Sequence, residues 1–107
     1  MSHNKVGDVQ VEQGNLPAAL ESFRASLAIA GRLTKADPGN AGWQRDLALS
    51  HGRVAIALTS GGANGDALTA FRHGRSIIAA LAEQSPDNAT LPKDLTWFDD
   101  QIAALGG

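Results

Sequence analysis

The chain reads GNLPAALESFRASLAIAGRLTKADPGNA from Gly14 to Ala41, and 48 residues further on it reads GANGDALTAFRHGRSIIAALAEQSPDNA from Gly62 to Ala89. The two stretches align without a gap and keep a turn glycine, an Ala-Leu pair, a Phe-Arg pair and a closing proline in register. Between residues 2 and 47 this offset gives 15 identical pairs, whereas composition alone gives about 3. Because unrelated amphipathic helices would not keep their turn residues in register, we interpret the pattern as a duplicated unit.

Turn residues divide each unit into helices. The Gly-Asn pair at 14–15 and the glycine-rich segment 61–65 are turn sequences, since glycine accepts positive φ angles. Pro38 and Pro86 end the preceding helices, because proline cannot continue a helix. Between these breaks the apolar side chains recur at helical spacing, and no alternating strand pattern competes. We therefore expect five helices, at about residues 2–13, 17–35, 41–60, 66–84 and 92–105.

The predicted fold is all-α and consists of antiparallel helix-turn-helix repeats. Its parts are a unit at about residues 2–49, a second unit at about 50–97 and a C-terminal capping helix at about 92–105. A length of 107 residues allows a single domain, 1–107, and a hydrophobic content of 43% is enough for a packed core. Phe23 and Phe71 occupy the same position in the two units, so we expect both to be buried anchors.

Composition and charge exclude several classes of function. The formal net charge is −2, whereas nucleic-acid binding usually needs a basic stripe that neutralises phosphates. The chain has no cysteine, so it has neither disulfides nor thiolate chemistry. The N-terminal sequence MSHNKVGDVQVEQG lacks the apolar region of a secretory signal, and the longest apolar run, residues 77–82, is far too short for a membrane span. We expect a cytoplasmic protein with no nucleic-acid or membrane partner.

The repeated positions resemble those of the tetratricopeptide repeat (TPR) family. In that pattern a small residue precedes the turn glycine by seven, and an alanine, an aromatic residue and a small-Leu pair follow it. The matching residues are Gly7, Gly14, Ala19, Phe23 and Ser26-Leu27 in the first unit, and Ala55, Gly62, Ala67, Phe71 and Gly74-Arg75 in the second. Pro38 and Pro86 follow the aromatic residue by fifteen positions where the usual pattern has eight, so the second helix of each unit is longer. This spacing is similar to the long repeats of kinesin light chains and many bacterial arrays.

The resemblance implies a TPR-like α-solenoid that acts as a non-catalytic protein–protein interaction module. In such domains the first helix of each unit lines a concave groove that holds a peptide or a partner helix. The matching positions here are Asn4, Asp8, Val11, Arg45, Leu49, Gly52, Ile56, Thr59, Lys93 and Trp97. The family's charged clamp for a C-terminal carboxylate is not reproduced, because Gly52 and Ile56 have no side-chain donors. A carboxylate-terminal peptide is therefore not the expected ligand.

The helix predicted at 41–60 is apolar on two sides. One side carries Leu47, Val54 and Leu58, and a nearly opposite side carries Leu49 and Ile56. A helix of this kind is either sandwiched between neighbours or presents a binding face. Both interpretations stay open from the sequence.

Two histidines occupy equivalent positions, His3 and His51, and repeat packing explains both at once. The alternative is a phosphotransfer-type helical signalling bundle that uses an exposed His51, although Val54 stands where such domains usually place a lysine. Partial burial of His51 would favour the first interpretation. Neither a metal-ligand set nor a Ser-His-Asp set can be proposed from the spacing, so we expect no enzyme, metal or cofactor.

The N-terminal edge of the repeat array suggests a third possibility. The first predicted helix begins at Ser2-His3 and lacks a counterpart of residues 43–47, so we interpret the sequence as beginning partway through a repeat. Ile29 and Leu33 on the second helix would then be uncovered. We expect a fragment of a longer array or a structural oligomerisation segment, most simply a homodimer through the first two helices.

Overall fold

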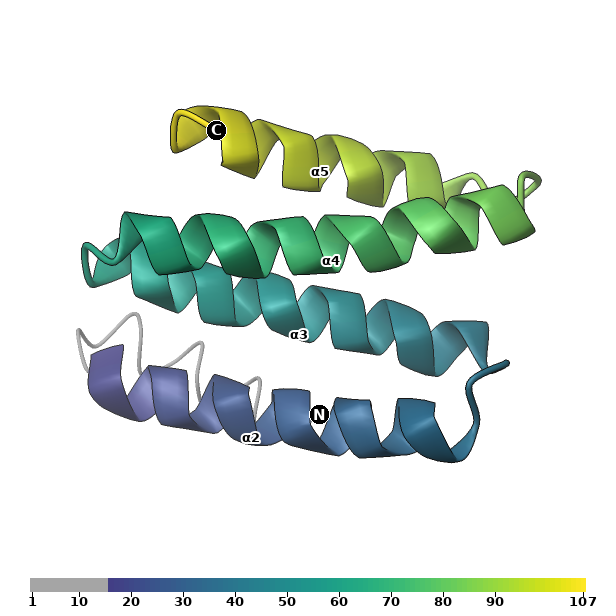
Figure 1. Cartoon of the computed structure of the whole chain (residues 1–107), viewed down its shortest axis with the longest axis horizontal. Helices are drawn as coiled ribbons and strands as arrows, with labels where there is room; N and C mark the ends of the chain where they lie inside the picture. Colours follow the sequence, from purple (N-terminus) through teal and green to yellow (C-terminus); the bar gives the residue numbers. More distant parts are fainter. Residues whose placement is uncertain (1–15) are drawn as a thin grey trace.

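The computed structural model describes residues 16–107, which form four α-helices and no β-strand (Figure 1). They are α2 (Leu16–Ala36), α3 (Ala41–Ser60), α4 (Asn64–Gln84) and α5 (Thr90–Ala104). The predicted all-α class is confirmed for this part of the chain, whereas the helix expected at 2–13 lies outside the described residues. None of these four helices combines the length and the apolarity needed to cross a membrane.

The helix ends follow from local side-chain chemistry. The Asn40 side chain accepts a hydrogen bond from the backbone N–H of Trp43 at 3.1 Å, and this N-cap starts α3 at the predicted residue. Helix α5 begins at Thr90, two residues before the prediction, because Asn88 accepts a hydrogen bond from the Thr90 N–H at 3.0 Å. Pro92 is tolerated inside the first turn, where backbone N–H groups have no intrahelical acceptor.

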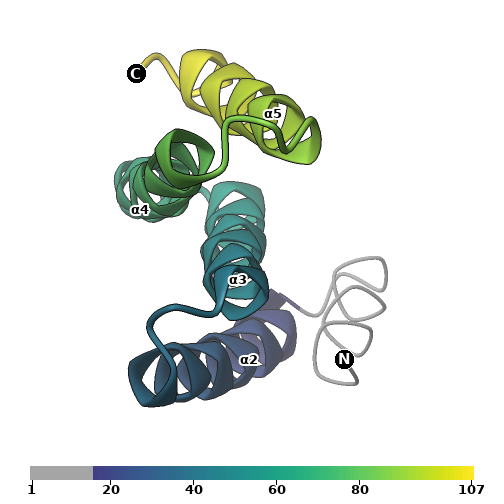
Figure 2. The ribbon, with the colours of Figure 1, turned by 90° about the vertical axis from the view of Figure 1, so that its right-hand side faces the viewer.

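Consecutive helices pack side by side and run antiparallel (Figure 1). Seen along the helices, α3 and α5 lie on the same side of α4 (Figure 2). The connections between the helices are short, and their sequences contain residues that favour turns. Gly62, for example, has φ +84°, a conformation that a glycine adopts without strain. Because α3 and α5 lie on the same side of α4, they are close enough to form a shared surface.

The core consists of two clusters centred on the repeated phenylalanines. Phe23 packs with Ala19, Val54 and Ala57 between α2 and α3. Phe71 belongs to a larger cluster, formed with Ala48, Ala55, Ala67, Ile78, Leu81, Leu91 and Phe98 of α3, α4 and α5. Phe23 is 2% exposed and Phe71 is 1% exposed, so the prediction that both are buried is confirmed.

Close approach of α4 to its neighbours depends on a glycine. A Cβ atom at Gly74 would lie 2.5 Å from the Phe98 ring and 2.8 Å from the carbonyl oxygen of Ala48. Both distances are far shorter than van der Waals contact. Only glycine therefore fits where α4 meets α3 and α5.

Candidate functional site

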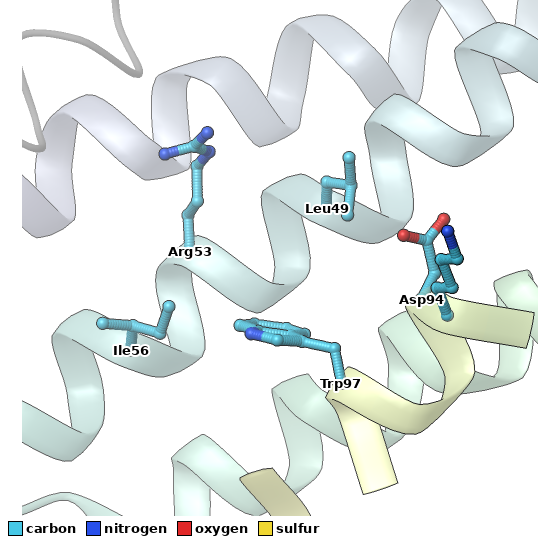
Figure 3. Close-up of a pocket in the computed structure, with 6 residues that line it drawn as sticks. Leu49, Arg53, Ile56, Asp94 and Trp97 are labelled. Atoms are coloured by element: carbon cyan, nitrogen blue, oxygen red, sulfur yellow. The ribbon is translucent and has the colours of Figure 1, made fainter. Parts of the chain in front are cut away.

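A groove lies between α3 and α5 and has a volume of about 380 Å³ (Figure 3). Six residues line it, namely Leu49, Arg53 and Ile56 from α3 and Lys93, Asp94 and Trp97 from α5. The three residues of α3 follow one another at intervals of four and three, so they share one face of the helix. Lys93 and Trp97 share a face of α5 for the same reason. The groove is thus built from α3 and α5, whose sequences are related by the 48-residue offset.

Trp97 forms the floor of the groove and is held in place on several sides. Its ring meets those of Phe98 and Phe71 edge to face, with centroids 4.9 and 5.8 Å apart. Beneath it lies Gly52, where a Cβ atom would be 3.0 Å from Cζ3 of the indole. Trp97 is nevertheless 36% exposed, and Figure 3 shows its indole reaching from α5 toward α3. A rigidly packed aromatic side chain therefore presents part of its surface to solvent.

The two apolar sides of α3 have different surroundings. Val54 is buried with the α2 cluster, whereas Ile56 is 37% exposed beside the groove. The helix is sandwiched between α2 and α4 on one part of its surface and contributes an open apolar face on another. The sandwiched interpretation therefore holds for one part of the helix, and the other part leaves an apolar face open.

An ion pair joins α3 and α5 at the groove. The Nε of Arg45 donates to one carboxylate oxygen of Asp94 at 2.8 Å, and Nη2 donates to the other at 3.3 Å. This hydrogen-bonded contact with Asp94 raises the pKa of Arg45 above its ordinary value, and the nearby charge of Asp46 adds to the effect. The Asp94 side chain is only 13% exposed. Its charge is therefore matched inside the protein by a forked guanidinium contact.

Comparisons with protein-family models, with curated proteins and with solved structures gave no match. The function must therefore be inferred from the groove and from the chemistry that its residues allow.

Four of the residues predicted for the groove line it, namely Leu49, Ile56, Lys93 and Trp97. Gly52 is buried beneath the indole, and Arg45 binds Asp94 next to the groove. Thr59 does not line this groove. Its hydroxyl donates to the Ala55 carbonyl oxygen of its own helix at 2.9 Å. Asn4, Asp8 and Val11 lie outside the described residues.

Sequence reasoning missed two lining residues, Arg53 and Asp94. Arg53 could have been found, because it lies four residues after Leu49 on the same helical face. Asp94 is the repeat counterpart of Asp46, and repetition alone does not say that it binds Arg45. The distance between α3 and α5 determines whether Arg45 and Asp94 can meet.

The lining of the groove contains one carboxylate, and an ion pair engages it. Asp94 is the only carboxylate among the lining residues, and Arg45 binds both of its oxygens. A general base needs a group that is free to accept a proton from a substrate. Within residues 16–107 no three histidine, cysteine or carboxylate side chains gather as a metal site would require.

His51 is half-buried between α3 and α4. Its ring meets that of His73 edge to face, with centroids 5.4 Å apart. Burial, and secondarily the charge of His73, lower the pKa of His51 below its ordinary value. The partial burial agrees with a packing role, whereas the phosphotransfer alternative needs an exposed ring.

We predict that the free energy of unfolding falls as the pH decreases below about 6.5, the ordinary pKa of histidine. In that range the unfolded chain binds a proton at His51 more readily than the folded chain, so protonation favours unfolding. The loss of stability should level off once the pH falls below the pKa of His51 in the folded chain. Urea denaturation between pH 8 and pH 5 should show a weaker decline in His51→Gln than in the wild-type chain. If the free energy of unfolding declines equally with pH in the two proteins, protonation of His51 is not the cause of the decline.

Proposed function

We propose that this chain is a non-catalytic protein-interaction module that binds a peptide or a partner helix in the α3–α5 groove. The observation that carries the proposal is Trp97, an aromatic side chain packed on three sides and one-third exposed inside an apolar hollow. Aromatic residues in such positions dominate the energetics of protein interfaces. A side chain that is already fixed also loses little conformational entropy when a partner binds.

The same proposal assigns the chain a TPR-like repeat architecture. Phe23 and Phe71 are buried at equivalent positions, and the small residues Ser26 and Gly74 are buried three positions after them. In TPR-like arrays these positions allow paired helices to approach closely, and the first helices of successive units line the binding surface. We assign α3 and α5 to those first helices, because the 48-residue offset relates their sequences and both line the groove.

The surface around Leu33 bears on self-association. Leu33 is 39% exposed on α2, as expected for an uncovered side of that helix. A homodimer through the first two helices stays a prediction, because the first of these lies outside the described residues. Sedimentation at micromolar concentration tests it, and a strictly monomeric species would contradict it.

The binding proposal can be tested by selecting 12-residue peptides from a displayed library on the full chain. Trp97→Ala and Ile56→Ser should each lower the affinity of a selected peptide by about 30-fold, the effect of removing a typical interface hot spot. Ile56→Ser is the gentler variant, because this side chain is already 37% exposed and its loss should leave the fold intact. Affinities are measured by fluorescence anisotropy, after circular dichroism has confirmed folding of each variant.

Leu33→Ser provides the matched control, since Leu33 is as exposed as Ile56 but lies on α2, away from the groove. It should leave the affinity unchanged. Peptides that bind all three variants as tightly as the wild-type chain would place binding elsewhere and contradict the proposal.

A further inference from the structure

The charges beside the groove identify the kind of segment that it binds. Resting on the function proposed above, we infer that the occupant is an acidic segment of a partner protein, with an aliphatic side chain on Trp97 and Ile56 and a side-chain carboxylate at Lys93.

Lys93 and Arg45 occupy the same position in successive repeats. Arg45 uses its charge to bind a carboxylate, Asp94, which is presented by the next helix lining the groove. Lys93 has no ion-pair partner within residues 16–107. Arg45 thus shows what a cation at this position can bind, and no carboxylate of residues 16–107 takes the corresponding place beside Lys93.

The location of Lys93 within α5 also favours an anionic ligand. It is the fourth residue of a helix that begins at Thr90. A cation in the first turn faces the positive end of the helix dipole, so it does not stabilise the helix that carries it. An anion bound beside Lys93 would be attracted both by the ammonium group and by the end of the helix.

The groove presents cationic side chains, although the chain carries a net charge of −2. Its lining contains two cations, Arg53 and Lys93, and one carboxylate, Asp94, which Arg45 neutralises. Asp46 also lies near Arg45, so the second carboxylate of this region faces the same guanidinium. Arg53 has a further interaction within the chain, but a guanidinium has five donor hydrogens and can serve that interaction and a ligand together.

The dimensions of the groove select a short segment. Leu49 and Ile56 are seven residues apart, which is about 10 Å along a helix. The volume of about 380 Å³ is at the lower end of sites that enclose a drug-sized ligand. One large aliphatic side chain and its neighbours fit on the indole, with a flanking carboxylate directed to Lys93. Charge thus selects the partner, and the apolar floor provides the contact area.

The test uses four pools of labelled 12-residue peptides and the full chain. In the first pool a central leucine is flanked by aspartate and glutamate, and both ends are capped. The second replaces these acids by asparagine and glutamine, and the third by lysine. The fourth repeats the neutral sequences with a free C-terminal carboxylate. We expect the acidic pool to bind about tenfold more tightly than the neutral pool, and added salt should reduce this preference.

Lys93→Glu should remove the preference for acidic peptides. The variant keeps its fold, because a glutamate suits the first turn of a helix better than a lysine. Lys35→Glu is the matched control, with the same charge change on α2, away from the groove, and it should preserve the preference.

The outcomes separate this inference from the function on which it rests. Tighter binding of the neutral or basic pool that still depends on Trp97 would overturn the inference and leave the groove assignment intact. Exclusive binding of the fourth pool would overturn it in favour of a terminal carboxylate, and binding of no pool would overturn it as well. Acidic peptides that bind equally to Trp97→Ala and Ile56→Ser would contradict both the inference and the proposed groove. Self-association of the chain that blocks the acidic pool would show a second copy to be the occupant.

Discussion

Phe71→Ala is expected to lower the free energy of unfolding by about 3–5 kcal/mol, because it removes a large buried ring and leaves a cavity. Phe71 is fully enclosed in the larger core cluster and contacts the rings of Phe98 and Trp97. A domain of this size has a total stability of about 5–15 kcal/mol, so the variant should be close to unfolding. Urea denaturation followed by circular dichroism measures the loss.

Phe23→Ala should have a comparable effect, since Phe23 is the equivalent anchor of the smaller cluster. Leu33→Ala is the control, because a side chain that is 39% exposed contributes little burial, and its loss should cost less than about 1 kcal/mol. Wild-type stability in both phenylalanine variants would show that the two clusters are not the core of the fold.

Gly74→Ala should also be strongly destabilising, although alanine is the better helix former by about 1 kcal/mol. The added methyl group would lie 2.5 and 2.6 Å from two atoms of the Phe98 ring and 2.8 Å from the Ala48 carbonyl oxygen. Phe98 is fully buried, and a backbone oxygen cannot rotate away, so α4 must move from α3 and α5. Overpacking of this kind costs about 1–3 kcal/mol or more.

Gly65→Ala isolates the packing effect from helix propensity. Gly65 lies in the same helix, and a Cβ atom there has no described neighbour within 4 Å. This variant should be stabilised by about 0.4–1 kcal/mol. Thermal melts of the two variants should therefore shift in opposite directions. Equal shifts would mean that close approach at Gly74 does not limit the packing of α4.

The sequence predicts the helices well because their ends depend on local residues. The bounds of α3 agree at both ends, since Asn40 caps its start and Gly61-Gly62 follow its end. Contacts between helices are harder to predict. Nothing in the repeat indicates that Gly74 lies against Phe98, because its counterpart in the first unit is Ser26. Ser26 is itself buried, and its hydroxyl has no hydrogen-bond partner among the described residues.

In the candidate site, too, the positions along each helix could be predicted, whereas the contacts between helices could not. Leu49, Ile56 and Trp97 could be assigned to one surface from their repeat positions, because equivalent helices of successive units face the same way. The Arg45–Asp94 pair depends on the distance between α3 and α5, which helical periodicity does not determine. His51 was expected to be partly buried, but its contact with His73 could not be foreseen, because Ala25 stands at the equivalent position of the first unit.

The most direct test of the binding groove is a map of amide chemical-shift changes, recorded by NMR on the full chain during titration with a selected peptide. The assigned groove predicts that the largest changes occur at Leu49, Ile56 and Trp97, including the indole N–H, with small changes along α2 and the outer side of α4. Large changes confined to α2 or α4, with the groove signals unmoved at saturation, would contradict it.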